Sequence, residues 1–257
     1  MAQAIAEGAE GAKNSLFVGD KEKYVQEMFS GIASRYDLMN DVLSLRQHYN
    51  WRKLAVSLAN VKAGDTCLDV CTGTGDFALD LAKAVTQTGR VVASDFCEPM
   101  IRNGLHKLPT ASAPVTMMVS NAEALPYSSD RFDAVTVGFG IRNVAHIDCA
   151  LREMTRVAKP GGRVVILEFN RPRQKWYKPF VDFYLFRILP RIGGLFSRRE
   201  AYTYLPESMK QFVSREKLES LMREAGLRDI SIRDLNFGTV CIHIGTKPLR
   251  SETEARS

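Results

Sequence analysis

Apolar and β-branched residues recur through the middle of the chain in short runs, and stretches of helical spacing lie between these runs. The strand-like runs are residues 66–71, 90–95, 115–119, 132–137 and 163–169. The helical stretches are residues 77–85, 98–108 and 148–158. Strands that alternate with helices in this way predict a parallel sheet with helices on both of its faces.

The end of the chain predicts a different arrangement. Two strand-like runs, 227–235 and 239–246, are joined by Asn236-Phe237-Gly238, which indicates a hairpin. A hairpin added to a parallel sheet requires its last strand to run antiparallel to the others. By analogy of fold, this is the sheet of the class I S-adenosylmethionine-dependent methyltransferases, a Rossmann-like α/β fold with seven strands, mostly parallel. Residues 159–162, Lys-Pro-Gly-Gly, are expected to stop the helix before the fifth strand.

The first strand joins the first helix of this alternation through a glycine-rich turn, in the sequence TCLDVCTGTGDFALDL. Gly73 and Gly75 let the backbone bend sharply and approach a ligand, and the free N–H groups of the next helix point at the same place. Together with Asp95, this spacing also fits a dinucleotide fingerprint. However, Asp69 and Asp76 flank the turn, and two carboxylates favour a cation over a pyrophosphate. We therefore expect S-adenosylmethionine, which carries an ammonium and a sulfonium, and keep a nucleotide site or a purely structural turn as alternatives.

Composition is that of a soluble globular protein, because 45% of the 257 residues are hydrophobic and 25% are charged. The formal net charge of +6 favours contact with anionic surfaces but does not say whether these are nucleic acid or lipid. The five cysteines form no C-x-x-C pair, so we expect reduced thiols and no metal site. The N-terminus lacks the layout of a secretory signal, which together with the thiols predicts a cytoplasmic protein.

A single methyltransferase domain is expected over residues 21–250, between a flexible tail at 1–20 and a second tail at 251–257. Two segments break the alternation within it. Residues 21–60 form a helical cap in which polar and aromatic side chains are interleaved with apolar ones. Residues 170–212 form an insertion rich in aromatic and basic residues, whose charges and prolines exclude a membrane span. A substrate lid, a membrane-surface element or a cover for the sheet edge all fit this insertion.

Five stretches of the sequence resemble the UbiE/MenG-type quinone C-methyltransferases, and together they cover residues 24 to 246. The stretches are Tyr36-Asp37-x-Met39-Asn40-x-x-Leu43-Ser44-x-x-x-His48-x-x-Trp51, Asn121-Ala122-Glu123-Ala124-Leu125-Pro126-Tyr127, Gly138-Phe139-Gly140-Ile141-Arg142-Asn143, Arg156-Val157-Ala158-Lys159-Pro160-Gly161-Gly162 through Leu167-Glu168-Phe169, and Tyr202-x-Tyr204-Leu205-Pro206-x-Ser208. The first stretch is specific to the family.

The resemblance implies methylation of a ring carbon of demethylmenaquinol, or of the ubiquinone precursor 2-polyprenyl-6-methoxy-1,4-benzoquinol, with S-adenosylmethionine as the methyl donor. The family's cofactor positions fall on Thr74 in the turn, on Asp95, and on Asn121 and Ala122 after the third strand. By residue type, Asp95 would hold the ribose hydroxyls while Asn121 and Ala122 face the adenine. Gly138, also assigned to the cofactor site, stands where relatives often carry Ser.

Four positions depart from the family pattern, namely Arg46, Tyr49, Ala158 and Asn170. They leave the expected cofactor site intact. They affect the local shape of the cap, and therefore the details of substrate choice.

Four polar residues are the catalytic candidates: Tyr36 and Asn40 on the cap, and Arg142 and Asn143 after the fourth strand. An aromatic carbon accepts a methyl group when the hydroquinone hydroxyl is deprotonated or strongly hydrogen-bonded, so the enzyme must align the groups and hold the phenolate. Arg142 is the leading residue for stabilising the phenolate, or for polarising a water that takes the proton, since a guanidinium is too weak a base.

Two histidines are further candidates for a base. His48 is expected to pack between helices of residues 21–60 or to cap the end of one of them. His243 alternates with apolar neighbours in the last strand, and we expect it at the surface or at an edge.

A prenylated quinol resides in the bilayer, so the insertion is expected to dock on anionic headgroups at the inner face of the cell membrane, with the tail in lipid or in an apolar groove. No nucleic-acid partner is expected, because no RNA-binding motif is present and the turn after the fourth strand lacks the Asn/Asp-Pro-Pro-aromatic pattern. A homodimer and an association with other quinone-biosynthesis enzymes stay open. The alternative functions are methylation of another small phenolic or lipid acceptor, and a catalytically silent quinone-binding scaffold.

Overall fold

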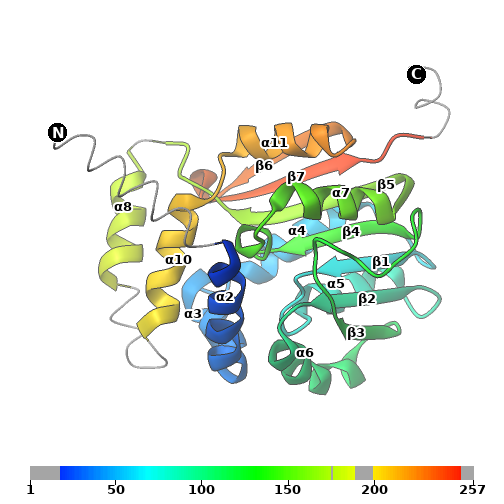
Figure 1. Cartoon of the computed structure of the whole chain (residues 1–257), viewed down its shortest axis with the longest axis horizontal. Helices are drawn as coiled ribbons and strands as arrows, with labels where there is room; N and C mark the ends of the chain where they lie inside the picture. Colours follow the sequence, from blue (N-terminus) through cyan, green and yellow to red (C-terminus); the bar gives the residue numbers. More distant parts are fainter. Residues whose placement is uncertain (1–17, 175, 189–198, 250–257) are drawn as a thin grey trace.

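A computed structural model of the chain describes residues 18–174, 176–188 and 199–249, so the expected tails lie almost wholly outside the described residues. Its centre is a seven-stranded sheet with the strand order β3-β2-β1-β4-β5-β7-β6 (Figure 1). The strands are β1 (Thr66–Val70), β2 (Arg90–Asp95), β3 (Val115–Val119), β4 (Phe132–Gly138), β5 (Ala158–Phe169), β6 (Arg228–Leu235) and β7 (Val240–Thr246). Strand β7 pairs antiparallel with both β5 and β6, and the other pairs are parallel. The predicted fold class and terminal hairpin are confirmed.

Helices and short helical turns connect and cover the strands. The longer helices are α2 (Val18–Ile32), α3 (Tyr36–Ser44), α4 (His48–Ala59), α5 (Asp76–Val85), α6 (Glu98–Gly104), α7 (Ile147–Val157), α8 (Lys178–Phe183), α10 (Arg199–Gln211) and α11 (Arg215–Glu224). Short turns are η1 (Ala33–Arg35), η2 (Leu105–Thr110), η3 (Ile141–Asn143), η4 (Tyr184–Ile188) and η5 (Asn236–Gly238).

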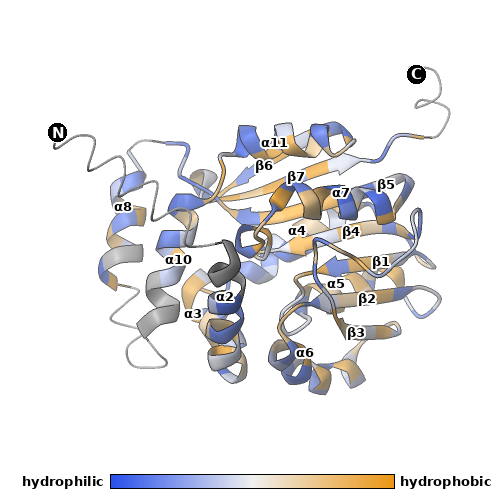
Figure 2. Cartoon of the chain, in the orientation of Figure 1, coloured by the Kyte–Doolittle hydropathy of each residue, from blue (hydrophilic) through white to orange (hydrophobic). Residues whose placement is uncertain are grey.

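Successive residues of each strand point to opposite faces of the sheet, and each face has its own hydrophobic core. Leu68 and Val135 belong to the core that includes Leu151 of α7 and Leu218 of α11. The neighbouring positions Cys67 and Ala134 belong to the core that contains residues of α4 and α5. Figure 2 shows the central strands as mainly hydrophobic, as expected for a sheet covered on both faces.

The cap and the insertion lie together over one end of the sheet. Helices α2, α3, α8 and α10 gather at the end where the parallel strands terminate (Figure 1). Met28 and Ile32 of α2 and Met39 of α3 form one buried cluster with Leu205 and Met209 of α10. The segments that break the alternation in the sequence therefore pack on each other at the carboxyl edge of the sheet, where ligands of such folds bind.

Two element boundaries differ from the sequence expectation. Strand β5 begins at Ala158, so residues 159–162 belong to this strand and do not form a separate turn between the helix and the strand. The pairing of β4 with β5 shifts register between Phe132 and Ala134, so the strand is bulged there. The helix expected over 98–108 ends at Gly104 and continues as the 3₁₀ turn η2. Pro109 lies in that turn, and its ring is incompatible with the carbonyl of an α-helical residue four positions earlier.

His243 is buried, with an exposed fraction of 0%, so the expectation of a surface or edge position was wrong. Its strand, β7, is inserted between β5 and β6 and is not an edge of the sheet. The ring nitrogen Nε2 donates to the backbone oxygen of Arg215 at 3.1 Å, and burial lowers the pKa of the imidazole. This histidine therefore fastens the start of α11 to the sheet.

Asp69, near the end of β1, holds the glycine turn in place through hydrogen bonds. Its carboxylate accepts hydrogen bonds from the hydroxyl of Thr72 at 2.5 Å and from the hydroxyl of Thr136 in β4 at 2.7 Å. The side chain is 0% exposed, and burial raises its pKa to about 7 in spite of both hydroxyls. Cys71, Gly73 and Gly75 follow with positive φ angles of 53°, 58° and 88°. Asp69 thus shapes the turn and faces the protein interior.

The raised pKa of Asp69 predicts a pH-dependent stability. Because the folded-state value of about 7 lies above the reference of 3.8, the folded chain holds a proton that the unfolded chain has released. The contribution of Asp69 to the free energy of unfolding therefore falls as the pH rises from about 4 to about 7. We expect wild type to lose stability relative to Asp69→Asn between about pH 5 and about pH 8, measured by urea denaturation. Glu98→Gln, at a surface carboxylate, is the control, and an equal difference at both pH values would contradict this assignment.

Candidate active site

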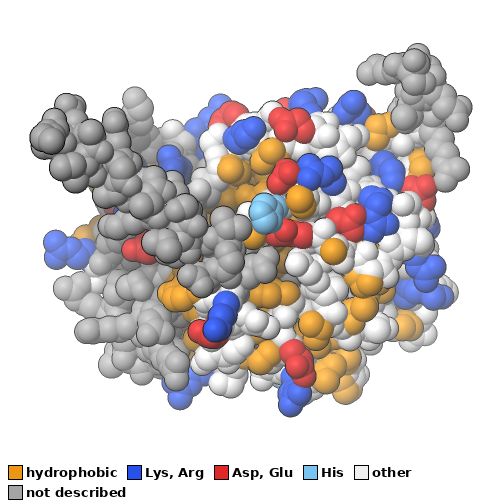
Figure 3. All heavy atoms as spheres, in the orientation of Figure 1, with side chains coloured by type: hydrophobic (Ala, Val, Ile, Leu, Met, Phe, Trp, Pro, Cys, Tyr) orange, Lys and Arg blue, Asp and Glu red, His pale blue; other side chains and the backbone are white. Residues whose placement is uncertain are grey.

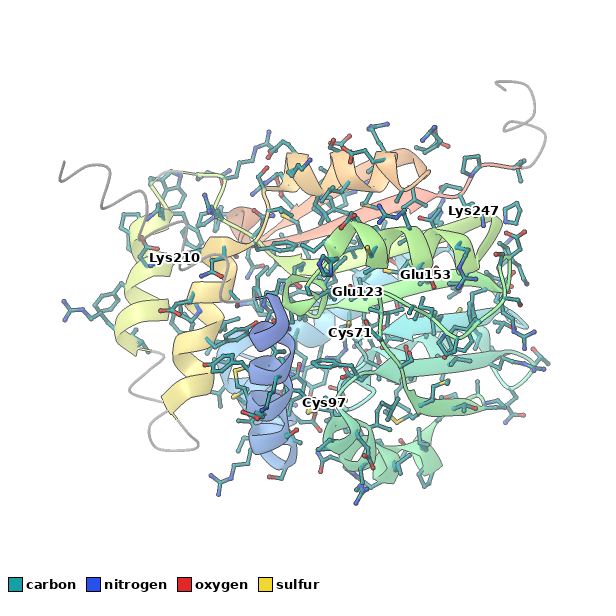
Figure 4. The ribbon with its side chains drawn as sticks, viewed as in Figure 1. Cys71, Cys97, Glu123, Glu153, Lys210 and Lys247 are labelled. Carbon is teal, nitrogen blue, oxygen red and sulfur yellow. The ribbon has the colours of Figure 1, made fainter. Side chains whose placement is uncertain are left out.

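A cavity lies at the carboxyl ends of β1, β2, β3 and β4, and we call it the polar cavity. It encloses about 700 Å³, counted to its open side, and Cys71, Asp95, Asn121 and Phe139 from the four strand ends line it. Strands β1 and β4 are neighbours, and the strand order extends from them in opposite directions. This is the switch point at which open α/β sheets bind ligands. Figure 4 shows Cys71, Cys97 and Glu123 along this edge.

Asp95 is held rigidly in the wall of the polar cavity. One carboxylate oxygen accepts the backbone N–H of Gly73 at 2.8 Å, and the other accepts the backbone N–H of Cys97 at 2.9 Å. Burial raises the pKa of Asp95, and these backbone donors oppose that effect. A carboxylate oxygen can accept more than one hydrogen bond, so both oxygens can also receive ribose hydroxyls.

Another part of the wall of the polar cavity follows β3. Asn121 accepts the backbone N–H of Glu123 at 2.9 Å, and Ala122 between them is buried. Glu123 in turn accepts the backbone N–H of His146 at 2.9 Å and lies 2.8 Å from its ring nitrogen Nδ1. An amide beside a buried methyl group suits the polar edge and the flat face of a base. The residues that line the cavity thus fit the ribose and adenine of the expected methyl donor.

Four of the eight expected cofactor residues line the polar cavity, namely Gly73, Asp95, Asn121 and Ala122. The other four, Asp69, Thr74, Gly75 and Gly138, do not line it. Gly75 is the N-cap residue before α5 and has a positive φ, and a Cβ atom there would lie 3.1 Å from the methyl group of Met117. A Cβ at Gly138 would lie 2.7 Å from the ring of Phe77, so this chain has no room for the Ser of its relatives.

Thr74 connects the turn to the cap. Its hydroxyl donates to Asp37 of α3 at 2.6 Å. Lys107 lies 2.6 Å from Asp37 and also 2.6 Å from Asp76, which opens α5. Arg52 lies 3.4 Å from Asp76 as well. Asp76 is therefore compensated by two cations, which corrects the expectation that Asp69 and Asp76 supply the negative field of the pocket.

The carboxylates that do line the polar cavity are Asp95 and Glu123. The preference for a cationic ligand is thus retained, but it comes from different residues. Glu123 was missed at the sequence level, although it stands two residues after Asn121 in a stretch shared with the family.

A second cavity lies beside the first, between the cap, α10 and the ends of β4 and β5. It encloses about 660 Å³, and we call it the apolar cavity, because Met28, Ile32, Met39, Leu43, Trp51, Phe169 and Leu205 line much of it. Phe29, Tyr36 and Phe139 line both cavities. The two cavities therefore share a wall of three aromatic rings.

All four catalytic candidates line at least one of the two cavities. Tyr36 lines both cavities, Asn40 and Arg142 line the apolar cavity, and Asn143 lines the polar one. Asn40 hydrogen-bonds the hydroxyl of Tyr36, and burial raises the pKa of that hydroxyl. The hydroxyl of Tyr204, a residue given no role at the sequence level, donates to Asn143 at 2.9 Å. The cap, β4 and the insertion thus each contribute to one cluster of polar groups.

Arg142 is held by a buried carboxylate. Its guanidinium lies 2.7 Å from Glu168, whose side chain is 1% exposed, and donates to the backbone oxygen of Phe139. The guanidinium carbon also lies 5.6 Å from the centre of the Phe169 ring. Burial raises the pKa of Glu168, and Arg142 opposes that effect. Glu168 was missed because nothing in the local sequence shows that β5 places it beside η3.

His48 lines the apolar cavity and is mostly buried. Its ring nitrogen Nδ1 lies 2.6 Å from the hydroxyl of Ser44, and Nε2 lies 3.5 Å from Asp41. Burial and the nearby Arg52 lower the pKa of the imidazole, in spite of Asp41. The ring joins α3 to α4, and its packing role agrees with the sequence expectation. Within the described ranges, no cluster of three or more His, Cys, Asp or Glu residues is arranged to hold a metal ion.

Comparison with known proteins places this geometry in a family. A model of the ubiE/COQ5 methyltransferase family matches residues 18–247. The ubiquinone/menaquinone biosynthesis C-methyltransferase UbiE of Geobacter sulfurreducens is 44% identical over 90% of this chain and 91% of its own. The demethylmenaquinone methyltransferase of Shouchella clausii is 42% identical over 89% of this chain and 98% of its own.

Solved structures share the fold at lower identity. A methyltransferase of Thermotoga maritima, described as a possible histamine N-methyltransferase, is 20% identical and has a TM-score of 0.60, over 86% of this chain and 99% of its own. A methyltransferase of Aquifex aeolicus is 20% identical with a TM-score of 0.56, over 76% and 88%. Both are described as S-adenosylmethionine-dependent, and at this identity they confirm the fold. The family match and the more similar relatives confirm the expected enzyme class and, with it, the expected methyl donor. Given a family model that spans nearly all of the described residues, the chain belongs to the ubiE/COQ5 methyltransferase family.

Proposed function

We propose that this methyltransferase methylates a ring carbon of demethylmenaquinol in menaquinone biosynthesis. The observation that supports this most strongly is the aromatic wall shared by the two cavities, because it lets a polar donor and an apolar ring meet. The names of the relatives support the acceptor, since one is a demethylmenaquinone methyltransferase. A second relative is named for both ubiquinone and menaquinone, so a polyprenyl methoxybenzoquinol is the second candidate acceptor.

The chain's own residues would position the donor from one side. Asp95 would accept the ribose hydroxyls, and Asn121 with Ala122 would contact the adenine. S-adenosylmethionine supplies a methyl group on a positively charged sulfur, and the carboxylates of Asp95 and Glu123 favour a cation in this cavity. The three aromatic rings of the shared wall would exclude water from the place where the methyl group is transferred.

The reaction forms one carbon–carbon bond with an electron pair of the ring and breaks one sulfur–carbon bond. The ring becomes reactive as its hydroxyl gives a proton to water. After methyl transfer the ring carbon loses its own proton to water and the phenolate oxygen regains one, so that one proton is released overall. Arg142 would stabilise the phenolate, because it lines the apolar cavity, where the attraction between a guanidinium and a phenolate is stronger than in water. Glu168 would keep the guanidinium oriented, and Tyr36, Asn40 and Asn143 would hydrogen-bond the quinol oxygens or the donor.

The charge distribution supports a small acceptor. On the face shown in Figure 3, Lys and Arg side chains are interspersed with Asp and Glu side chains. A nucleic-acid-binding protein gathers its basic residues along one face or groove. We therefore keep nucleic acid outside the proposal.

The direct test is incubation of the purified chain with S-adenosylmethionine and reduced demethylmenaquinol, followed by mass spectrometry of the quinone. We expect a product heavier by one methyl group, on the ring carbon. Asp95→Asn should bind the donor more weakly, which isothermal titration calorimetry measures separately. Methylation of another phenol but not of demethylmenaquinol would overturn the acceptor. Donor binding without any methyl transfer would favour a silent scaffold.

A paired variant tests the role of Arg142. Removing Arg142 alone leaves Glu168 buried without its partner, a change that costs about 3–5 kcal/mol of stability in buried ion pairs. We therefore use Arg142→Gln together with Glu168→Gln, which removes both charges. We expect kcat to fall by about 10²-fold or more, as for loss of one oxyanion donor, while donor affinity stays within about threefold. Arg152→Gln, at the surface, is the control. An equal loss of donor affinity would instead assign Arg142 to donor binding.

We also propose that the chain docks on the membrane surface through exposed aromatic residues. Trp176, Phe180, Phe183 and Phe237 are 53% to 65% exposed, and we call them the aromatic cluster. The ring centres of Trp176 and Phe237 are 5.5 Å apart. Such residues favour the boundary between water and lipid.

Basic residues near the cluster contribute less than the sequence suggested. Arg173 lies 3.1 Å from Asp234, and Lys178 forms an ion pair with Asp182. The charges of these two residues are therefore already compensated, and the proposal rests on the aromatic cluster. In the part of the chain that the structure describes, no helix is both long and apolar enough to span a bilayer.

Vesicle co-sedimentation tests this surface. We expect Trp176→Ser with Phe180→Ser to weaken binding to vesicles of anionic and zwitterionic lipid by about tenfold, because two exposed rings no longer insert. Leu105→Ser, at an exposed apolar residue of η2, is the matched control and should bind like wild type. Equal binding of all three chains would contradict docking through the aromatic cluster, and loss of binding in high salt alone would assign it to charge.

A further inference from the structure

A third cavity lies beside the apolar cavity and is open to the surface of the protein. Its empty space, including the open mouth, is about 880 Å³. Leu43, Ser44, Trp51, Phe169 and Leu205 line both cavities, so the two are adjacent. We call this third cavity the tail groove.

The walls of the tail groove come from the insertion and from the terminal hairpin. Four residues of the insertion line it, namely Tyr177 just before α8, Val181 in α8, Tyr184 in η4 and Met209 in α10, and Val240 lines it from the start of β7. The surface of the groove is thus mainly hydrocarbon and aromatic. Contact with an apolar chain removes such a surface from water, which is favourable, whereas a charged ligand finds few polar partners there.

Side-chain hydrogen bonds fasten these walls together. The hydroxyl of Tyr184 donates to the backbone oxygen of Leu43 at 3.1 Å, which joins the insertion to the cap. Asn236 donates to the side-chain oxygen of Gln47 at 2.6 Å, which joins the hairpin to the cap. The groove is therefore formed by three parts of the chain that are distant in sequence, and its shape does not depend on a single loop.

The open end of the tail groove lies at the aromatic cluster. Phe180 lines the groove and is 65% exposed, and Leu45, which also lines it, is 70% exposed. Tyr177 lines the groove as well, and its ring centre is 4.7 Å from that of Phe237. The groove thus leads from the ring-binding cavity to the surface proposed to contact lipid.

We propose that the tail groove binds the first isoprene units of the acceptor's hydrocarbon tail and guides the rest toward the membrane. This rests on the proposed function, since it takes the acceptor to be a prenylated quinol. A quinol ring in the apolar cavity has its attached chain beside Trp51, Phe169 and Leu205, where the groove begins. The groove then sets a preference for tailed over tail-less quinols, in addition to any preference for the ring.

The test fills the groove without changing the ring-binding cavity. Val181→Trp places a large ring in the groove, and Phe183→Trp is the matched control on the same helix, at a residue outside the lining. In detergent micelles, kcat/KM is measured for naphthohydroquinone without a tail and for its analogue with four isoprene units. We expect the ratio of the two values, tailed over tail-less, to fall by about tenfold in Val181→Trp and to stay at the wild-type value in Phe183→Trp.

A binding measurement separates this inference from the proposed function. Geranylgeraniol, a free chain of four isoprene units, should bind wild type and Phe183→Trp but not Val181→Trp, as measured by tryptophan fluorescence or calorimetry. If wild type methylates neither quinol but this pattern of binding is seen, the proposed acceptor is wrong, and the tail groove is still supported as a binding site for an isoprenoid chain. If Val181→Trp keeps the wild-type ratio and binds the alcohol, the tail groove is overturned. Should Val181→Trp fail to fold, Thr239→Phe fills the groove from the hairpin side and serves the same comparison.

Discussion

The structure depends on the contact between the ring of Tyr36 and the backbone of Gly73. A Cβ atom on Gly73 would lie 3.4 Å from that ring, which is an ordinary contact distance, and the positive φ of 58° is what favours glycine at this position. The contact brings the cap onto the glycine turn, and the bond from Thr74 to Asp37 holds it there. It also divides the space at the carboxyl edge into a cavity with carboxylates and a cavity without them. The expected donor and acceptor then lie in neighbouring cavities that share the rings of Phe29, Tyr36 and Phe139.

Charges at the site are placed where they are compensated. Asp95 is stabilised by backbone N–H groups, and Arg142 is stabilised by Glu168 at 2.7 Å. Buried charges without partners would be costly, and partners fixed by the fold remove most of the reorganisation that water would need. The ion pairs of Lys107 with Asp37 and Asp76 are separate from these groups, and they hold the cap on the glycine turn. Some charged groups therefore hold the walls of the cavities in place, and others line the cavities and face the expected ligands.

Local sequence predicted much of the fold and part of the site. The strands up to the turn at Gly73 and the acid at Asp95 follow from periodicity and from glycine, because these are properties of short segments. The orientation of Asp69 could not be predicted, since it is decided by a hydrogen bond to Thr136, 67 residues away. The burial of His243 likewise depends on strand order, which the sequence of β7 does not contain. The partner of Arg142 was missed for the same reason, as Glu168 meets it only through the pairing of β4 with β5.

The most direct measurement is a crystal structure of the chain with S-adenosylhomocysteine, the product form of the donor. We expect the ribose hydroxyls on Asp95, the base beside Asn121, and the sulfur directed at the wall formed by Tyr36 and Phe139, toward the apolar cavity. A ligand whose sulfur points away from that wall, or whose ribose is held by other residues, would contradict the division of the site into a donor cavity and an acceptor cavity.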